Sequence, residues 1–268
     1  MKRLLLFDVD GTIAESGQKM CNNIAQKLNE IKNGKFINDN SEIGKFVNDN
    51  TEIGIVGGGK LDKILWQTRN VKFDHYFSEC GCVYNKTYNN LENNLENNLE
   101  IIYEKNIREH ILYPQINILI KLSLKFLSEV NYTLTGNFVD LRTGIIYISL
   151  IGLTANEDER NYFKKLDTMF KYREKLLNIL QNKALELDIY NKIHIVYGGS
   201  VGIAIYPSEY DKKQIMDYIN HHEYSEIHYF GDKYTREGND YLLLNHEYVI
   251  GHRVNTVNET YEFLNKYF

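Results

Sequence analysis

Apolar and polar positions along the chain fall into blocks that predict two kinds of architecture. The unbroken apolar run in KRLLLF predicts a buried strand. The next segment, GQKMCNNIAQKLNEIKN, has Met20, Ile24, Leu28 and Ile31 at helical spacing and predicts an amphipathic helix. IGIVGGGKLDKIL then predicts a second strand, a glycine turn and a helix. Strand, helix and strand in this order are typical of a parallel α/β domain.

The middle of the chain has a different pattern, which is typical of an α+β module. Helices are predicted over about residues 114–130 and 156–187. NFVDLRTGIIYISLIG predicts an antiparallel hairpin, and KIHIVYGGSVGIAIYP predicts a second one. The α/β pattern then returns, with SEYDKKQIMDYINHH as a helix and EIHYF and YVIGHRV as strands. VNETYEFLNKYF predicts a terminal helix, with Asn258 as its cap.

These blocks predict an α/β fold in which a smaller domain interrupts a larger one. We expect the core domain to span residues 1–85 and 208–268, and an inserted α+β cap domain to span residues 86–207. Two Asn- and Glu-rich repeats, residues 34–53 and 89–100, are predicted to be inserted surface loops or irregular helix.

Charge and cysteine content narrow the classes of function. The net charge of −5 on 268 residues gives no electrostatic case for binding nucleic acid or an anionic membrane. The first apolar run is too short for a signal sequence or a membrane span. Three cysteines make no disulfide framework, and Cys80-Gly81-Cys82 lacks the second Cys/His cluster of a metal site. We therefore expect a reducing, cytoplasmic location.

Two aspartates, Asp8 and Asp10, follow the first predicted strand in the segment LFDVDGT. Strands of α/β sheets end at the crevice where ligands bind. Two like charges at that point are unfavourable unless a cation offsets them, and Mg²⁺ prefers carboxylate oxygens. The pattern predicts Asp8 as a nucleophile toward phosphorus and Asp10 as a general acid and base. A solvated turn at Asp10-Gly11 is the structural alternative.

Later segments supply further parts of a phosphoryl-transfer site. GDKYTREGND follows a predicted strand and offers Asp232 and Asp240 as metal ligands beside the first two aspartates. Lys212 begins a predicted helix and is suited to neutralise a transferring phosphoryl group. Gly58 and Gly59 lie in a turn whose backbone N–H groups can cradle phosphate. Each signal is weak alone, because glycine turns and helical lysines are common, but their order together is specific.

This constellation resembles the haloacid dehalogenase superfamily, and within it the eukaryotic-type phosphomannomutase family. The matching segments follow one another along nearly the whole chain: LFDVDGT, IGIVGGG, DLRTG, IGLTANEDER, GGSVGIAIYP, YDKK and YFGDKYTREGND. The resemblance implies a Rossmann-like core with a cap. It implies interconversion of mannose 6-phosphate and mannose 1-phosphate with Mg²⁺ and an aspartyl-phosphate, a hexose 1,6-bisphosphate activator, and a place in GDP-mannose synthesis.

The resemblance also implies roles for individual residues. The first aspartate of LFDVDGT would carry the phosphoryl group, and the second would move protons. Asp232 would bind the metal and Lys212 the phosphoryl oxygens, while Arg142 and Arg160 in the cap would bind the sugar phosphate. Family members dimerise through the cap, so a homodimer is expected, with a small sugar phosphate as the ligand.

Several positions depart from the family pattern. Residues that differ from the arginines and polar side chains of the family are Gly17, Leu153, Gly202 and Ala204. Losing charge-assisted contacts to a phosphate weakens binding. Four interpretations therefore stay open: a phosphomannomutase with a remodelled cap, a Mg²⁺-dependent phosphatase or mutase for another phosphorylated metabolite, a non-catalytic relative, and an unrelated α/β protein.

Overall fold

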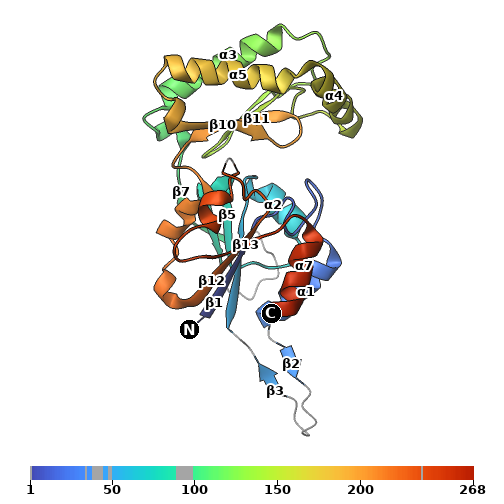
Figure 1. The fold of residues 1–268 in the computed structure, drawn as a ribbon, viewed down its shortest axis with the longest axis vertical. Coiled ribbons are helices and arrows are strands. Elements are labelled where there is room, and N and C mark those ends of the chain that lie inside the picture. The colour runs from blue at the N-terminus through green and yellow to red at the C-terminus, as the bar shows by residue number, and fades with distance from the viewer. Residues whose placement is uncertain (1, 34, 38–44, 48–49, 89–98, 237) are drawn as a thin grey trace. The chain divides into compact units, whose positions relative to one another are not determined.

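The computed structural model describes residues 2–33, 35–37, 45–47, 50–88, 99–236 and 238–268 (Figure 1). The chain forms two compact units. Unit 1 runs from Met1 to Glu104 and from Asp211 to Phe268, and unit 2 runs from Lys105 to Tyr210. The first boundary lies later than the predicted 85/86, because two further strands of the unit 1 sheet follow residue 82.

A seven-stranded sheet forms the centre of unit 1, in the order β13-β12-β1-β4-β5-β6-β7. The strands are β1 (Lys2–Phe7), β4 (Thr51–Val56), β5 (His75–Ser78), β6 (Val83–Thr87), β7 (Leu99–Glu104), β12 (Tyr224–Gly231) and β13 (Ile250–Arg253). From β13 to β5 all neighbours pair in parallel, and β6 and β7 pair antiparallel. Parallel strands join β1 to segments far apart in the sequence, as the α/β prediction requires.

The central strand β1 supplies side chains to both faces of this sheet. Leu5 and Phe7 pack in one core with residues of α1 (Asn22–Asn33) and α7 (Val257–Tyr267), which lie together on one side of the sheet (Figure 1). Leu4 and Leu6 pack in a second core, beside the 3₁₀ helix η5 (Lys212–Asp217) and α6 (Tyr241–Leu244). Burial on both faces explains why KRLLLF is apolar throughout.

Among the described residues of unit 1, the other helical segments are α2 (Leu61–Thr68) and the 3₁₀ turns η1 (Glu79–Gly81) and η6 (His221–Glu223). Two predictions here were wrong in detail. SEYDKKQIMDYINHH contains the 3₁₀ helix η5 instead of an α-helix, and the Asp211 side chain caps it by accepting the amide N–H of Lys213. Thr256, and not Asn258, caps α7, because its hydroxyl accepts the Glu259 amide N–H.

The two repeats are described in part. Within residues 34–53, strands β2 (Lys35–Ile37) and β3 (Lys45–Val47) pair antiparallel, where loop or irregular helix was predicted. The last residues of this repeat, from Thr51 to Ile53, belong to core strand β4. In the second repeat, residues 89–98 lie outside the described residues, and Leu99 and Glu100 begin β7.

Unit 2 contains a four-stranded antiparallel sheet in the order β10-β11-β9-β8. Its elements are β8 (Val139–Leu141), β9 (Ile146–Ser149), β10 (Ile193–Gly198), β11 (Gly202–Pro207), α3 (Tyr113–Ser128), α4 (Glu157–Phe170), α5 (Tyr172–Glu186), η3 (Ile107–Glu109) and η4 (Tyr190–Lys192). Both predicted hairpins are present, and α3 and α5 pack together on one face of the sheet (Figure 1). None of the described helices has the length and apolar character needed to cross a bilayer.

The helix predicted over residues 156–187 is two helices, because Lys171 separates α4 from α5 in a left-handed conformation with φ 57° and ψ 40°. A side chain in this region costs about 1–2 kcal/mol, whereas glycine adopts it freely. Replacing Lys171 by glycine is therefore expected to raise the free energy of unfolding by up to about 1 kcal/mol, after the added freedom of the unfolded chain is subtracted. Urea unfolding measures the change.

The matched control is Lys175→Gly, inside α5, which should lower the free energy of unfolding by about 1 kcal/mol. A loss of similar size from both substitutions would contradict the strain assigned to Lys171.

A histidine pair joins β12 to β13. His228 Nδ1 lies 2.8 Å from His252 Nε2, and the two rings stack. Burial lowers the pKa of both imidazoles, that of His252 to about 4, where the charge of His228 adds to the effect. Both rings are therefore neutral in the folded protein at pH values at which an unfolded chain, with a histidine pKa near 6.5, takes up protons.

This pair predicts that stability is lost as pH falls from about 6.5 toward 4, with a slope of up to about 1.4 kcal/mol per pH unit for one proton. His252→Asn should flatten that slope in a series of urea unfolding experiments. The same substitution at exposed His222 is the control and should leave the slope in place. Equal slopes for wild type and His252→Asn would show that the pair does not drive acid sensitivity.

Candidate active site

The candidate site forms at the carboxyl ends of β1 and β12. Asp8 directly follows β1, is only 7% exposed, and donates its backbone N–H to the carbonyl of Phe230 on β12. Asp232 directly follows β12. Neighbouring parallel strands therefore bring these two aspartates to the same edge of the sheet, as predicted for α/β ligand sites.

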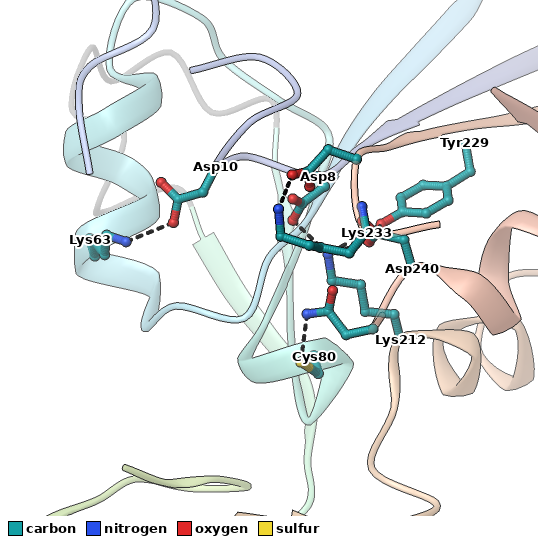
Figure 2. A network of polar contacts seen from close by, with 10 residues as sticks. Asp8, Asp10, Lys63, Cys80, Lys212, Tyr229, Lys233 and Asp240 are labelled. Carbon is teal, nitrogen blue, oxygen red and sulfur yellow. Dashed lines mark hydrogen bonds and ion pairs between the residues drawn. The ribbon is translucent and has the colours of Figure 1, made fainter. Parts of the chain in front are cut away.

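A fully buried lysine joins two carboxylates at this edge (Figure 2). Lys212 Nζ lies 2.5 Å from Asp8 Oδ1 and 2.7 Å from Asp240 Oδ1. It also lies 3.2 Å from the Tyr229 hydroxyl, which itself donates to Asp240. The Lys233 amide donates to the other Asp240 oxygen at 2.8 Å. Asp240 therefore has protein partners on both oxygens, and it holds Lys212 beside Asp8.

Burial and neighbouring charges shift the pKa values of Asp8, Lys212 and Asp240 in different directions. Burial raises the pKa of Asp8 to about 7, against the opposing charge of Lys212. Burial opposes the charged form of Lys212, but the carboxylates of Asp240 and Asp8 outweigh it and raise the lysine pKa. Burial also opposes ionised Asp240, yet Lys212 keeps that pKa lowered. Asp8 is thus the least stabilised anion of the set, which suits a carboxylate that forms a covalent bond.

Three carboxylates form a cluster that fits a divalent cation. One oxygen from each of Asp8, Asp232 and Asp240 lies within 4.8 Å of the others. Lys233 pairs with Asp232 Oδ2, whereas Asp232 Oδ1 is buried without a hydrogen-bond partner. A buried oxygen left in this way is unfavourable, and Mg²⁺ binds such carboxylate oxygens. The donor set therefore fits Mg²⁺.

The glycine of LFDVDGT is required by this cluster. Gly11 has φ +92°, and a Cβ atom there would lie 2.5 Å from Asp232 Oδ2. The close approach of the loop to Asp232 therefore excludes any side chain at residue 11.

The Asp10 side chain, predicted as a fourth metal ligand, does not join the cluster. Its carboxylate accepts hydrogen bonds from Lys63 Nζ at 2.9 Å, Gln67 Nε2 at 2.8 Å and the Gly17 amide at 2.8 Å. Burial would raise the pKa of Asp10, but these three donors together lower it. Sequence reasoning missed Lys63 and Gln67, although their spacing of four on a helix after the glycine turn puts them on one face.

The predicted phosphate loop joins β4 to α2. The carbonyl of Gly59 accepts the Glu79 amide at 3.0 Å, and that of Gly57 accepts the Cys80 amide at 2.9 Å. A Cβ atom on Gly58 would lie 3.7 Å from Cys80 Sγ. The loop precedes the N-terminus of α2, which favours anions, so Gly58 and Gly59 occupy a position suited to phosphate.

The two predicted substrate arginines lie in unit 2, and both are held by neighbours. Arg142 Nε pairs with Asp140 Oδ2 at 2.8 Å. Arg160 donates from Nε to the Ala155 carbonyl at 2.9 Å and from Nη2 to the Leu153 carbonyl at 3.0 Å. These contacts fix the direction of each guanidinium group.

Tyr147 on β9 explains one departure from the family pattern. A Cβ atom on Gly202 would lie 2.4 Å from Tyr147 Cζ, and one on Gly198 would lie 2.5 Å from its Cε2. The tyrosine ring occupies this space together with the Ile148 carbonyl oxygen, which would lie 2.5 Å from a Cβ atom on Gly202. The Tyr147 hydroxyl donates to the Gly198 carbonyl at 2.8 Å. Burial raises the pKa of the Tyr147 hydroxyl, and the guanidinium charges of Arg142 and Arg173 oppose this rise. Sequence reasoning did not single out Arg173.

Comparison with solved structures confirms the predicted fold class. The C-terminal domain of the C. albicans trehalose-6-phosphate phosphatase has a TM-score of 0.58 and 13% identity, with 99% of this chain and 92% of that chain covered. A haloacid dehalogenase-like hydrolase from Bacteroides thetaiotaomicron has a TM-score of 0.56 and 13% identity, with 100% of both chains covered. The α/β core with an inserted α+β unit is thus a haloacid dehalogenase-type fold.

Comparison with known sequences confirms the predicted family. The family model described as eukaryotic phosphomannomutase matches residues 41–268. The phosphomannomutase of Solanum lycopersicum is 27% identical over 261 residues, which cover 96% of this chain and 90% of that protein. The chain belongs to the eukaryotic phosphomannomutase family.

Proposed function

We propose that this protein transfers a phosphoryl group with Mg²⁺ and interconverts mannose 6-phosphate and mannose 1-phosphate. The observation that carries this proposal is the buried Lys212 ammonium between Asp8 and Asp240, beside the partnerless oxygen of Asp232. The relatives named phosphomannomutases support the choice of sugar. A cytoplasmic location fits the three free cysteines among the described residues. A role in supplying GDP-mannose synthesis follows from the proposed reaction.

The chemistry assigned to the chain begins at Asp8. A carboxylate oxygen of Asp8 bonds to the phosphorus of a phosphorylated sugar while the bond to the sugar oxygen breaks. The Lys212 ammonium, held by Asp240, stabilises the charge on the phosphoryl oxygens. The phosphoryl group then passes from Asp8 to the free hydroxyl of a mannose monophosphate, which gives the 1,6-bisphosphate. The bisphosphate returns its other phosphoryl group to Asp8 and leaves as the isomer, so a hexose 1,6-bisphosphate serves to load Asp8 at the start.

Asp10 is assigned the proton transfers of both steps. It protonates the sugar oxygen that leaves and later accepts the proton of the hydroxyl that attacks. In the structure Asp10 is held by Lys63 and Gln67. Asp10 therefore exchanges these partners for a sugar oxygen before it acts.

Mg²⁺ held by Asp8 and Asp232, with Asp240 beside them, would supply further positive charge for the phosphoryl oxygens. We propose that Arg142 and Arg160 bind phosphate on the ligand, since both are oriented by neighbouring groups. The proposed ligand is a small sugar phosphate, with neither nucleic acid nor membrane as a partner. The homodimer through the cap stays a prediction.

A second candidate function is a phosphatase or mutase for another phosphorylated metabolite. The observation that favours it is Tyr147, which takes the space that a side chain at residue 202 would need. Polar contacts to a hexose are then fewer on this face of unit 2. In a phosphatase, water takes the place of the sugar hydroxyl in the second step.

A coupled assay distinguishes these functions. Purified protein with Mg²⁺, mannose 1-phosphate and glucose 1,6-bisphosphate is expected to form mannose 6-phosphate faster than it releases inorganic phosphate. Release of phosphate without isomerisation would favour the second candidate. If the folded protein forms neither mannose 6-phosphate nor inorganic phosphate, that result would count against both functions.

Asp8→Asn is expected to lower kcat by about 10³-fold or more, because the nucleophile is removed. Asp188→Asn is the matched control and should be neutral, since its side chain is fully exposed. The coupled assay gives the rates, and circular dichroism shows that both variants fold. Activity retained by Asp8→Asn would rule out an aspartyl-phosphate at residue 8.

A further inference from the structure

The turn η1, Glu79–Gly81, has an unusual backbone. All three residues have positive φ, of 51° for Glu79, 57° for Cys80 and 88° for Gly81. Residues with a side chain adopt this region at a cost in stability, and such a conformation persists only when surrounding contacts impose it. Glu79 and Cys80 are also buried, at 5% and 2% exposure. A strained and buried turn of this kind often marks a functional position.

The contacts of the turn connect it to the phosphate loop. The amides of Glu79 and Cys80 donate to the carbonyls of Gly59 and Gly57 at 3.0 and 2.9 Å. The carbonyl and the following N–H of a trans peptide point in opposite directions. Fixing these two carbonyls toward the turn therefore directs the N–H groups of Gly58 and Lys60 away from it.

The same turn also contacts both segments that supply the charged centre. Gln214, two residues after Lys212, donates from Nε2 to the Cys80 carbonyl at 2.9 Å. Asn239, next to Asp240, donates to Cys80 Sγ at 3.9 Å. Burial raises the pKa of the Cys80 thiol to about 11, so the sulfur is present as a neutral thiol. Cys80 thus lies where the phosphate loop, the lysine segment and the Asp240 segment meet.

We propose that the left-handed turn Glu79–Gly81, centred on Cys80, is a positioning element for phosphate binding. It orients the backbone N–H groups of Gly58 and Lys60 and fixes the Gly57–Gly59 loop relative to Lys212 and Asp240. The inference rests on the proposed function for its site, but it concerns binding of the phosphoryl group and not the identity of the sugar. Cys80 acts through the loop and takes no part in the chemistry.

The test compares two residues with the same backbone conformation. Lys171 has φ 57° and ψ 40°, and Cys80 has φ 57° and ψ 31°. β-Branched threonine tolerates this region poorly, so Cys80→Thr and Lys171→Thr both add local strain. The dissociation constant of inorganic phosphate with Mg²⁺ is measured by calorimetry for each full-length variant, and thermal unfolding gives each loss of stability.

Cys80→Thr is expected to weaken phosphate binding about tenfold, whereas Lys171→Thr should lose stability and change binding less than about twofold. In the coupled assay, Cys80→Thr should raise KM more than it lowers kcat. Equal phosphate affinity in Cys80→Thr and wild type would overturn the inference, as would an equal effect from Lys171→Thr or no phosphate binding by wild type. Absence of isomerisation alone would overturn the proposed function and leave this comparison intact.

If Cys80→Thr does not fold, Cys80→Gly provides the second test. Glycine removes the backbone cost and the thiol contact, so the variant should fold while the turn becomes free to leave its conformation. Phosphate binding is expected to weaken about threefold to fivefold, with Lys171→Gly unchanged as its control. Wild-type affinity in Cys80→Gly would show that the fixed turn is not needed.

Discussion

The site depends on one buried cation between two buried anions. Lys212 is fully buried, and removing an ammonium group from water is very costly unless close carboxylates compensate. Asp8 and Asp240 provide that compensation at 2.5 and 2.7 Å, and Tyr229 and Lys233 complete the bonds of Asp240. The charged centre is therefore stable only when three distant segments of unit 1 assemble together. The charged centre therefore forms only as unit 1 folds.

The strand pairing of unit 1 explains how the chain tolerates the insertion of unit 2 between Asp8 and Lys212. Asp8 and Lys212 are 204 positions apart, and the whole of unit 2 lies between them. Parallel pairing of β1 with β12 and β4 fixes the ends of these strands, and η5 starts immediately where the chain re-enters unit 1. The order of the strands, and not nearness in the sequence, therefore determines which residues contact one another in the site. Unit 2 can change without disturbing Lys212, provided that its two ends leave and return at the same places.

Features with a local physical cause were predictable from the sequence. The two-sided burial of β1 requires an apolar run, and that run predicted a buried strand. Features caused by distant partners were not predictable. Nothing in the segment ECG indicates positive φ at Glu79 and Cys80, because the groups that impose it include Gln214, which is 134 positions from Cys80. The direction of the Asp10 side chain likewise depends on Lys63 and Gln67. Strands β6 and β7 were not predicted, because the Asn- and Glu-rich repeat beside them interrupts the apolar pattern of a strand.

The structure shows the surroundings of two residues in unit 2 that depart from the family pattern, and the sequence did not reveal these contacts. Taken singly, Gly202 and Leu153 look like lost contacts. In the structure Tyr147 occupies the volume next to Gly202. Arg160 donates to the backbone carbonyl of Leu153, which any residue would supply, so the leucine side chain has no structural explanation. A larger residue at 202 would require both the tyrosine ring and the Ile148 carbonyl oxygen, 2.5 Å from a Cβ atom there, to move. Tyr147, Gly198 and Gly202 therefore form one packed set in this sheet, and the charges of Arg142, Arg160 and Arg173 oppose the rise that burial causes in the pKa of Tyr147.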